Sequence, residues 1–187
     1  MIVFVDFEAS SLGKRGFPIE VGWAAEDGTG EGHLIRPAPG WEEWSADAQA
    51  VHGIALDRLR REDVPHDEVA RRMVEALTGH DLYASAPSWD GQWLSRLLRA
   101  AGLPRHALRL RDTEEAQRRV GLAALDGAGV PADAREGVLA EVLGAARRAA
   151  ETGPPAHRAL DDARREVRLW QDVRRRALDA AARRRER

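Results

Sequence analysis

Two carboxylates stand two residues apart at the end of an apolar run near the start of the chain. In IVFVDFEASSLG, residues 2–13, Asp6 and Glu8 follow a strand-like segment. Side chains at positions i and i+2 of a strand project from the same face, so both carboxylates are expected to leave the sheet side by side. Like charges held that close repel unless something neutralises them.

The composition restricts what could neutralise this pair. There is no cysteine, so any metal must be held by oxygen or imidazole ligands, which favours hard cations such as magnesium or manganese. The 187 residues, 43% of them hydrophobic, are most simply one globular domain over 1–187. The sequence has neither a signal-peptide pattern nor an apolar run approaching about 18 residues, so we expect a soluble, cytoplasmic protein without a membrane partner.

A third carboxylate, Asp90, opens the predicted helix of WDGQWLSRLLRAAG. Leu94 and Leu97 follow it at i+4 and i+7, which places Asp90 on the buried face of that helix. A buried carboxylate is costly unless it is paired or bound to a metal. The alternative is an acid that caps backbone amides or complements the helix dipole. Trp89, four residues before Trp93, is either a core residue or a platform for a base.

The last acidic cluster is HRALDDA, residues 157–163. On one regular helix His157 and Asp162 would point roughly 140° apart, at about 100° per residue. The two prolines at 154–155 predict that the helix begins after them, so that His157 lies in the preceding loop and Asp162 in the first turn or two, within reach of one point. Alternatively His157 is a solvent-exposed loop histidine, and Asp161 competes for the role of the carboxylate.

The elements that must position these residues alternate between strands and helices. Strands are predicted at 2–7, 17–26, 31–37, 81–86 and 107–112, with a hairpin at the DGTG turn. Helices are predicted at 66–80, at 89–102, after a capping-box opening at Asp112, from about 132 to 151, and from the prolines to the C-terminus. Early strands followed by this alternation predict an α/β fold, a mixed five-stranded sheet flanked by helices.

The ordered set of motifs resembles the DEDDh branch of the DEDD superfamily of 3′ to 5′ exonucleases, which has a DnaQ-like, RNase H-like fold. The segments IEVGWA at 19–24 and VHGI at 51–54 resemble secondary marks of the family, and the resemblance spans roughly residues 2–170. Family spacing selects the second of the two adjacent acids in the third motif. The five motif positions fall, in order, on Asp6, Glu8, Asp90, His157 and Asp162.

The resemblance implies a metal-dependent enzyme that hydrolyses phosphodiester bonds at the 3′ end of nucleic acid and releases nucleoside 5′-monophosphates. The four acids would hold two divalent cations, Mg²⁺ or Mn²⁺, about 3.5 to 4 Å apart, with Asp6 as the natural bridging ligand. His157 would take the proton of the attacking water near neutral pH. By analogy, the residues expected to contact the substrate are Ser10, Ser11, Leu12, His52, Trp89 and Arg158.

Some features depart from the family pattern or leave alternatives open. The second motif, SAPSWDG, lacks the upstream Asn or His of many members, and DFEAS replaces the DTETTG of proofreading members and resembles RNA-processing relatives, which slightly favours RNA over DNA. The main alternative function is a catalytically inactive nucleic-acid-binding or regulatory domain on the same scaffold. The weaker alternative is an unrelated α/β domain whose acids are caps and surface charges.

Basic charge is concentrated at the C-terminus. Residues 163–187 contain ten arginines against four acids, and an Arg-rich helix is expected at about 171–187. These arginines could extend a surface for the phosphates of single-stranded DNA or RNA. Arginines are also favourable at any solvated helix C-terminus, which explains them equally well.

Overall fold

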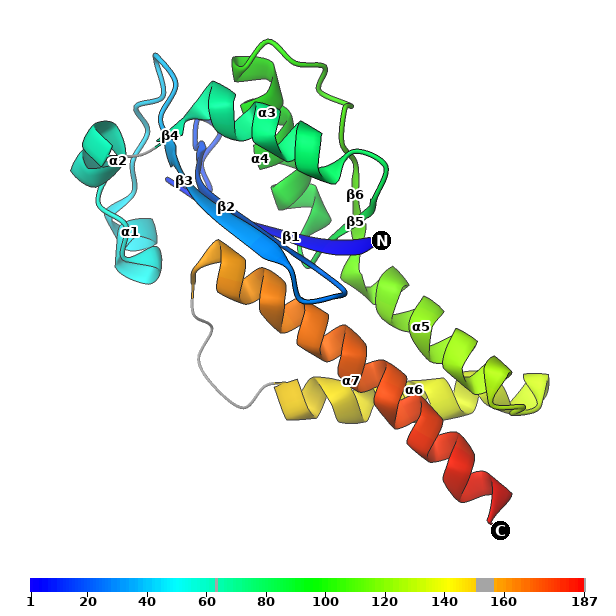
Figure 1. Ribbon diagram of the computed structural model, residues 1–187. Helices are drawn as coiled ribbons and strands as arrows, with labels where there is room; N and C mark the ends of the chain where they lie inside the picture. The colour runs from blue at the N-terminus through cyan, green and yellow to red at the C-terminus, as the bar shows by residue number, and fades with distance from the viewer. Residues whose placement is uncertain (63, 151–156, 187) are drawn as a thin grey trace.

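The computed structural model describes residues 1–62, 64–150 and 157–186 and is built around one mixed sheet (Figure 1). The strands are β1 (Ile2–Ala9), β2 (Pro18–Ala25), β3 (Gly30–Arg36), β4 (Val64–Pro65), β5 (Asp81–Ala84) and β6 (Leu110–Asp112). The helices are α1 (Ala46–His52), α2 (Leu56–Glu62), α3 (His66–Leu77), α4 (Pro87–Ala100), α5 (Thr113–Gly127), α6 (Ala132–Ala150) and α7 (Ala159–Arg185). The predicted α/β class is confirmed.

The sheet has the strand order β4-β3-β2-β1-β5-β6. β1, β2 and β3 are antiparallel neighbours, and Gly28 takes a positive φ of 90° in the turn of the expected hairpin. The predicted count of five strands is wrong, because β4 adds a sixth strand parallel to the end of β3. Its two residues, Val64 and Pro65, are too few to show a period-2 pattern in the sequence.

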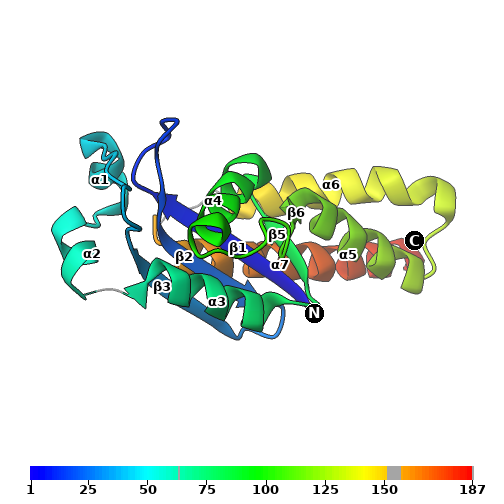
Figure 2. The ribbon, with the colours of Figure 1, turned by 90° about the horizontal axis from the view of Figure 1, so that it is seen from above.

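The two faces of the sheet are covered by different helices (Figure 2). On β1, Val3, Val5 and Phe7 join the hydrophobic cluster that also contains residues of α3 and α4. Phe4, the neighbour in the alternation, instead packs with residues of α5 and α7. Since side chains alternate along a strand, Asp6 and Glu8 belong to the face that α7 covers.

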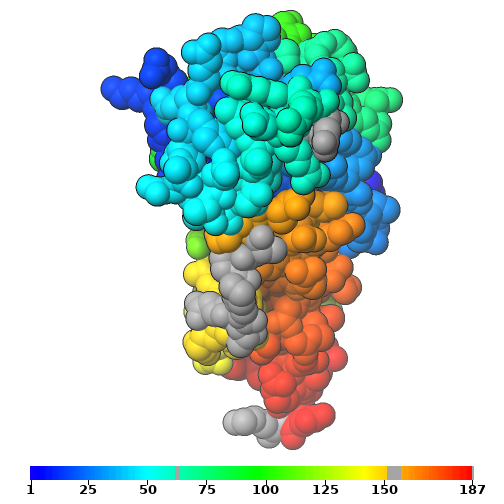
Figure 3. All heavy atoms as spheres, turned by 90° about the vertical axis from the view of Figure 1, so that its left-hand side faces the viewer, coloured from blue at the N-terminus to red at the C-terminus, as the bar shows by residue number. Residues whose placement is uncertain are grey.

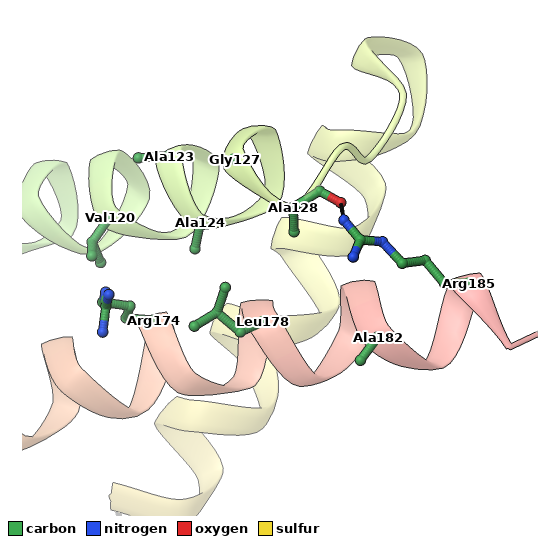
Figure 4. Close-up of a pocket in the computed structure, with 9 residues that line it drawn as sticks. All are labelled: Val120, Ala123, Ala124, Gly127, Ala128, Arg174, Leu178, Ala182 and Arg185. Carbon is green, nitrogen blue, oxygen red and sulfur yellow. Dashed lines mark hydrogen bonds between the residues drawn. The ribbon is translucent and has the colours of Figure 1, made fainter.

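The helices α5, α6 and α7 pack together and extend beyond the sheet, with a hydrophobic cluster of their own (Figure 1). The buried Trp170 joins α7 to the sheet. Between α5 and α7 lies a groove of about 540 Å³, beside which Leu178 is exposed, and the Arg185 guanidinium donates to the Ala128 carbonyl at its end (Figure 4). This groove lies in the C-terminal half of α7, away from Asp162.

Two short helices, α1 and α2, were not expected from the sequence. Ser45 caps α1 by accepting from the Ala48 amide, and Gly53 ends it with a φ of 70°. Each helix has seven residues, too short for a helical period to stand out. The two prolines at 154–155, after which the last helix was predicted to begin, lie outside the described residues. Within those residues no helix is both long and apolar enough to cross a membrane.

Candidate active site

Three carboxylates from the two ends of the chain meet on one face of the sheet. Oxygens of Asp6, Glu8 and Asp162 all lie within 4.8 Å of one another, and each of the three residues is partly buried. β1 supplies the first two and the first turn of α7 supplies the third. The predicted loop position of His157 and first-turn position of Asp162 match the start of α7 at Ala159.

The site forms where β1 outruns its parallel neighbour. β5 pairs with β1 from Ile2 to Phe4, and the chain then leaves β5 for α4. Asp6 therefore lies beyond the last paired residue on that side. The carboxyl end of a parallel strand pair leaves room for polar groups, which is where α/β sheets commonly bind their ligands.

Asp90 reaches this place from the opposite side of the sheet. It lies in the first turn of α4 and is 4% exposed. Its carboxylate accepts a hydrogen bond from the Ala86 amide at 3.3 Å and is also hydrogen-bonded by the backbone of Phe7. The buried position agrees with the sequence prediction, and the bond to Ala86 means that Asp90 also acts as a helix cap. Asp90 lies outside the group within 4.8 Å, although its charge acts on Asp6.

Burial raises the pKa values of three of these acids, Asp6, Glu8 and Asp90. Burial, followed by the charges of Asp90, Glu8 and Asp162, raises the pKa of Asp6 to about 9. The pKa of Glu8 is raised to about 7 by burial and by the nearby Glu20, and burial raises that of Asp90 to about 7. Carboxylates in this state would ionise readily if cations were bound between them.

His157 adopts a strained backbone directly before α7. It is partly buried and is the one residue other than glycine with a positive φ, 47°, within the described part of the chain. Its charge acts on His52, whose pKa is lowered by burial above all. Figure 3 shows the surface of α1 and α2, in cyan, bordering the first turns of α7, in orange.

Comparison with solved structures identifies the fold. An exonuclease I from Methylocaldum szegediense matches with a TM-score of 0.67 and 18% identity over 96% of this chain and 41% of that one. The zinc-bound E. coli exonuclease I complex with single-stranded DNA matches with a TM-score of 0.65 and 15% identity, over 94% and 40% respectively. The chain has an exonuclease I-like fold. It spans about two fifths of the length of these solved chains.

The likeness to exonuclease I is one of structure. No protein-family model matches the chain, and no curated protein matches it in sequence. A further match, E. coli exonuclease I in complex with a dA16 oligonucleotide, has a TM-score of 0.64 and 15% identity over 95% of this chain and 42% of that one. These values confirm the expected exonuclease-like α/β fold.

In this exonuclease I-like fold the loop after β1 is held by its serines. The buried Ser10 hydroxyl accepts from the Phe17 amide at 3.0 Å, and the Ser10 carbonyl accepts from the Ser45 amide. The Ser11 hydroxyl donates to Glu43 and accepts from the Gly13 amide. Leu12, which follows these two hydrogen-bonded serines, is 70% exposed. The hydrogen bonds of both serines are thus used within the protein, and Leu12 is the side chain that projects.

Trp89 and Arg158 are both accessible beside the acids. Trp89 is 41% exposed in the first turn of α4 and stacks on the buried Trp93, with ring centroids 5.9 Å apart. Arg158 is about half exposed, and its Nε and one terminal nitrogen donate to the buried Glu20. Its other terminal nitrogen has no part in that pair. Both side chains can therefore contact a ligand without leaving their packed positions.

Two acids near the site, Glu166 and Glu20, were not predicted from the sequence. Glu166 follows Asp162 by one helical turn, its charge acts on Asp6, and burial raises its pKa while a hydrogen bond from Thr113 lowers it. The i, i+4 spacing of Asp162 and Glu166 was the signal that could have found it. Glu20 lies directly across from Glu8 in the β1–β2 register. It was visible only as part of IEVGWA.

Proposed function

We propose that this chain is a divalent-cation-dependent 3′ to 5′ exonuclease acting on single-stranded nucleic acid. The observation that carries the proposal is the meeting of Asp6, Glu8 and Asp162 within 4.8 Å, on a fold like that of exonuclease I. Asp90 adds a fourth carboxylate, itself buried, whose charge acts on Asp6. An ordinary structural role does not explain why a fold would gather four acids at mutual cost.

The donor set suits hard divalent cations. All the gathered ligand atoms are carboxylate oxygens, the kind that Mg²⁺ and Mn²⁺ prefer. Burial first, and then the charges of the neighbouring carboxylates, hold the pKa of Asp6 near 9, and a bound cation would oppose both effects. Asp6, Glu8, Asp90 and Asp162 would hold two such ions. When bound, the ions supply charge neutralisation at the phosphate and make water a stronger nucleophile.

The chain's own residues have separate tasks in the hydrolysis. His157 accepts the proton of the water that attacks phosphorus, while the bond from phosphorus to the 3′ oxygen of the preceding nucleotide breaks. The products are a nucleoside 5′-monophosphate and a strand shortened by one nucleotide with a free 3′ hydroxyl. Trp89 stacks on a base near the 3′ end, and the terminal nitrogen of Arg158 that does not bind Glu20 faces a phosphate. Leu12, His52 and the backbone around Ser10 and Ser11 line the terminal nucleotide.

The nature of the sugar is a point on which the observations differ. The DFEAS sequence favours RNA, whereas matched exonuclease I structures are named as complexes with single-stranded DNA or oligonucleotides. The assay therefore compares 5′-labelled DNA and RNA strands of one sequence, each with a free or a blocked 3′ end. Mg²⁺, Mn²⁺ and EDTA are tested with each strand.

The expected result is a ladder of shortened strands that requires a free 3′ end and a divalent cation. Mass spectrometry should find nucleoside 5′-monophosphates, and Asp6→Ala should abolish them. Activity in EDTA, or activity unaffected by Asp6→Ala, would contradict the mechanism. Binding of strands without any hydrolysis would favour the inactive binding domain instead.

A further inference from the structure

Glu20 links the second strand to the start of the last helix. Its side chain is 5% exposed and accepts three hydrogen bonds from Arg158, at 2.7, 3.0 and 3.1 Å. The same carboxylate accepts from the Ala159 amide at 3.2 Å. A buried carboxylate bound in this way is well compensated, so its retention in the core requires no cation.

These contacts determine where α7 begins. Arg158 is the N-cap residue of α7 and its own side chain does not cap the helix. The first amides of a helix have no partner within the helix, and a carboxylate near them is favourable. Glu20 supplies that partner from β2, a strand far away in the sequence. The first turn of α7 therefore has its position fixed by the sheet.

Gly22, two residues further along β2, makes the second contact that positions this helix on the sheet. Glu20 and Gly22 lie on the same face of the strand because side chains alternate. A Cβ atom at Gly22 would overlap the backbone of Leu160. The absence of a side chain there allows the backbone of α7 to lie directly on the sheet. Glu20 fixes the helix end at this contact and Gly22 permits the close approach.

The contacts of Glu20 with the start of α7 also restrain His157, the strained residue before the helix. His157 has a φ of 47°, a conformation that is costly for a residue with a side chain and persists only where neighbours hold it. The contacts of Arg158 and Ala159 with Glu20 begin at the very next residue. Holding these two residues holds the backbone from which the His157 ring projects.

Glu20 is at the same time close to the acidic cluster. It lies opposite Glu8 in the β1–β2 register, and Arg158 provides the compensating positive charge. Removing the Glu20 charge would free Arg158 and release the N-terminus of α7 together. Asp162, in the first turn of that helix, would lose its fixed distance from Asp6 and Glu8.

We infer that Glu20 is a positioning residue: by binding Arg158 and the Ala159 amide it holds His157 and Asp162 in register with the acids of β1. This inference rests on the proposed exonuclease function for its catalytic meaning. Glu20 itself does not touch the substrate. Its effect passes through the two residues that it holds.

The test compares Glu20→Gln with Glu31→Gln. Glu31 on β3 forms a similar two-pronged pair with Arg72 of α3, but on the opposite side of the sheet from α7. Both variants remove one carboxylate charge and nearly preserve the side-chain shape. We expect Glu20→Gln to lower kcat by about 10- to 100-fold, as small misplacements of reacting groups do, with KM changed less than about threefold. Glu31→Gln should keep kcat within about twofold.

A second measurement does not require activity. In ¹⁵N-labelled protein the imidazole signals of the six histidines can be recorded, with His157→Gln assigning its ring. Glu20→Gln should shift the His157 signals and Glu31→Gln should not. If the wild-type protein hydrolyses no strand, the proposed function fails, while these signals still decide whether Glu20 positions His157. Unchanged His157 signals and unchanged kcat in folded Glu20→Gln would overturn the inference.

Glu20→Asp serves if the glutamine variant does not fold. It keeps the charge and shortens the side chain by one methylene, so part of the contact with Arg158 should remain. We expect an intermediate loss of kcat and an intermediate shift of the His157 signals at a temperature well below Tm. A lowered Tm with wild-type kcat and wild-type signals would show a role in folding only and would also overturn the inference.

Discussion

Asp6 of β1 and Asp162 of α7 have carboxylate oxygens within 4.8 Å of each other although they lie near opposite ends of the chain. The local structure around either residue cannot by itself bring the two carboxylates together. The distance exists because α7 lies on the sheet above Gly22 and begins at the contact with Glu20. The site is therefore a product of tertiary packing, and its chemistry should be sensitive to changes in that packing.

The stability of the metal-free protein should fall as the pH rises. The pKa of Asp6 is about 9 in the folded protein, against an ordinary value of 3.8. Between these values the folded protein keeps a proton that the unfolded chain has released, so raising the pH favours unfolding. We expect Tm in EDTA to fall from pH 5 to pH 9, and Mg²⁺ or Mn²⁺ to raise Tm more at pH 8 than at pH 5.

Asp6→Asn is the control for this pH dependence. A neutral amide does not need to take up a proton on folding as the Asp6 carboxyl does, so Asp6→Asn should be more stable than the wild type in EDTA at pH 8 by about 2 kcal/mol. At roughly 2–4 °C per kcal/mol, this is a rise in Tm of ~4–8 °C. Its Tm should also vary less with pH and respond less to Mg²⁺. Scanning fluorimetry over this pH range measures both. A wild-type Tm that rises with pH in EDTA would exclude this account.

The two adjacent acids of α7 should differ sharply in their effect on activity. Asp162 lies in the acidic cluster, whereas the side chain of Asp161 is 59% exposed and faces Arg164 at 3.9 Å. We expect Asp162→Asn to lower kcat by at least about 100-fold, because a charged ligand is lost where transition-state charge is stabilised. Asp161→Asn should stay within about twofold. Rates measured with saturating Mn²⁺ test both, and similar losses in the two variants would contradict the site.

Local patterns in the sequence predicted the parts of the site that local structure determines. The i, i+2 spacing of Asp6 and Glu8 predicted that they share a face, and the i+4 and i+7 leucines predicted the burial of Asp90. The break before α7 predicted that His157 precedes the helix. Each of these depends on the geometry of a single strand or helix. Their shared location was inferred from the resemblance to exonucleases.

The parts that escaped prediction depend on contacts between distant segments. β4 is a strand because Val64 lies beside Ile35, which nothing within two residues of sequence could indicate. Glu20 reads as one polar residue in a buried strand until its register with Glu8 and its contact with Arg158 are known. Gly22 is informative only once α7 lies over it. A single sequence carries no direct signal of such registers.

Gly22→Ala should destabilise the protein and displace α7. The added methyl would overlap the Leu160 backbone, which cannot move without shifting the helix. We expect a loss of about 2–3 kcal/mol, as for other overpacked positions, and a lower kcat because Asp162 moves with the helix. Gly137→Ala on α6 is the matched control, since its methyl would meet nothing within 4 Å. There the change should be neutral or stabilising by up to about 1 kcal/mol. Urea unfolding and rate measurements distinguish the two positions.

Trp89 and Trp93 lie one turn apart on α4, but truncating them should affect different properties, strand binding for Trp89 and stability for Trp93. Trp93 is 2% exposed in the main hydrophobic cluster, so Trp93→Ala should cost about 3–5 kcal/mol of stability. Trp89 is 41% exposed and stacks on it beside Asp90. Trp89→Ala should leave Tm within a few degrees but weaken strand binding by about 1–3 kcal/mol, roughly 5- to 150-fold, through lost base stacking.

Trp89→Phe is the variant that separates stacking from packing. A phenyl ring keeps a face for the base and should recover part of the affinity lost in Trp89→Ala. Binding is measured by anisotropy of a labelled single strand in Ca²⁺, which keeps a divalent charge at the site. A 3′-blocked strand should bind more weakly to the wild type, and the difference should shrink in Trp89→Ala. Equal affinity of both variants and the wild type would place Trp89 outside the path of the 3′ end.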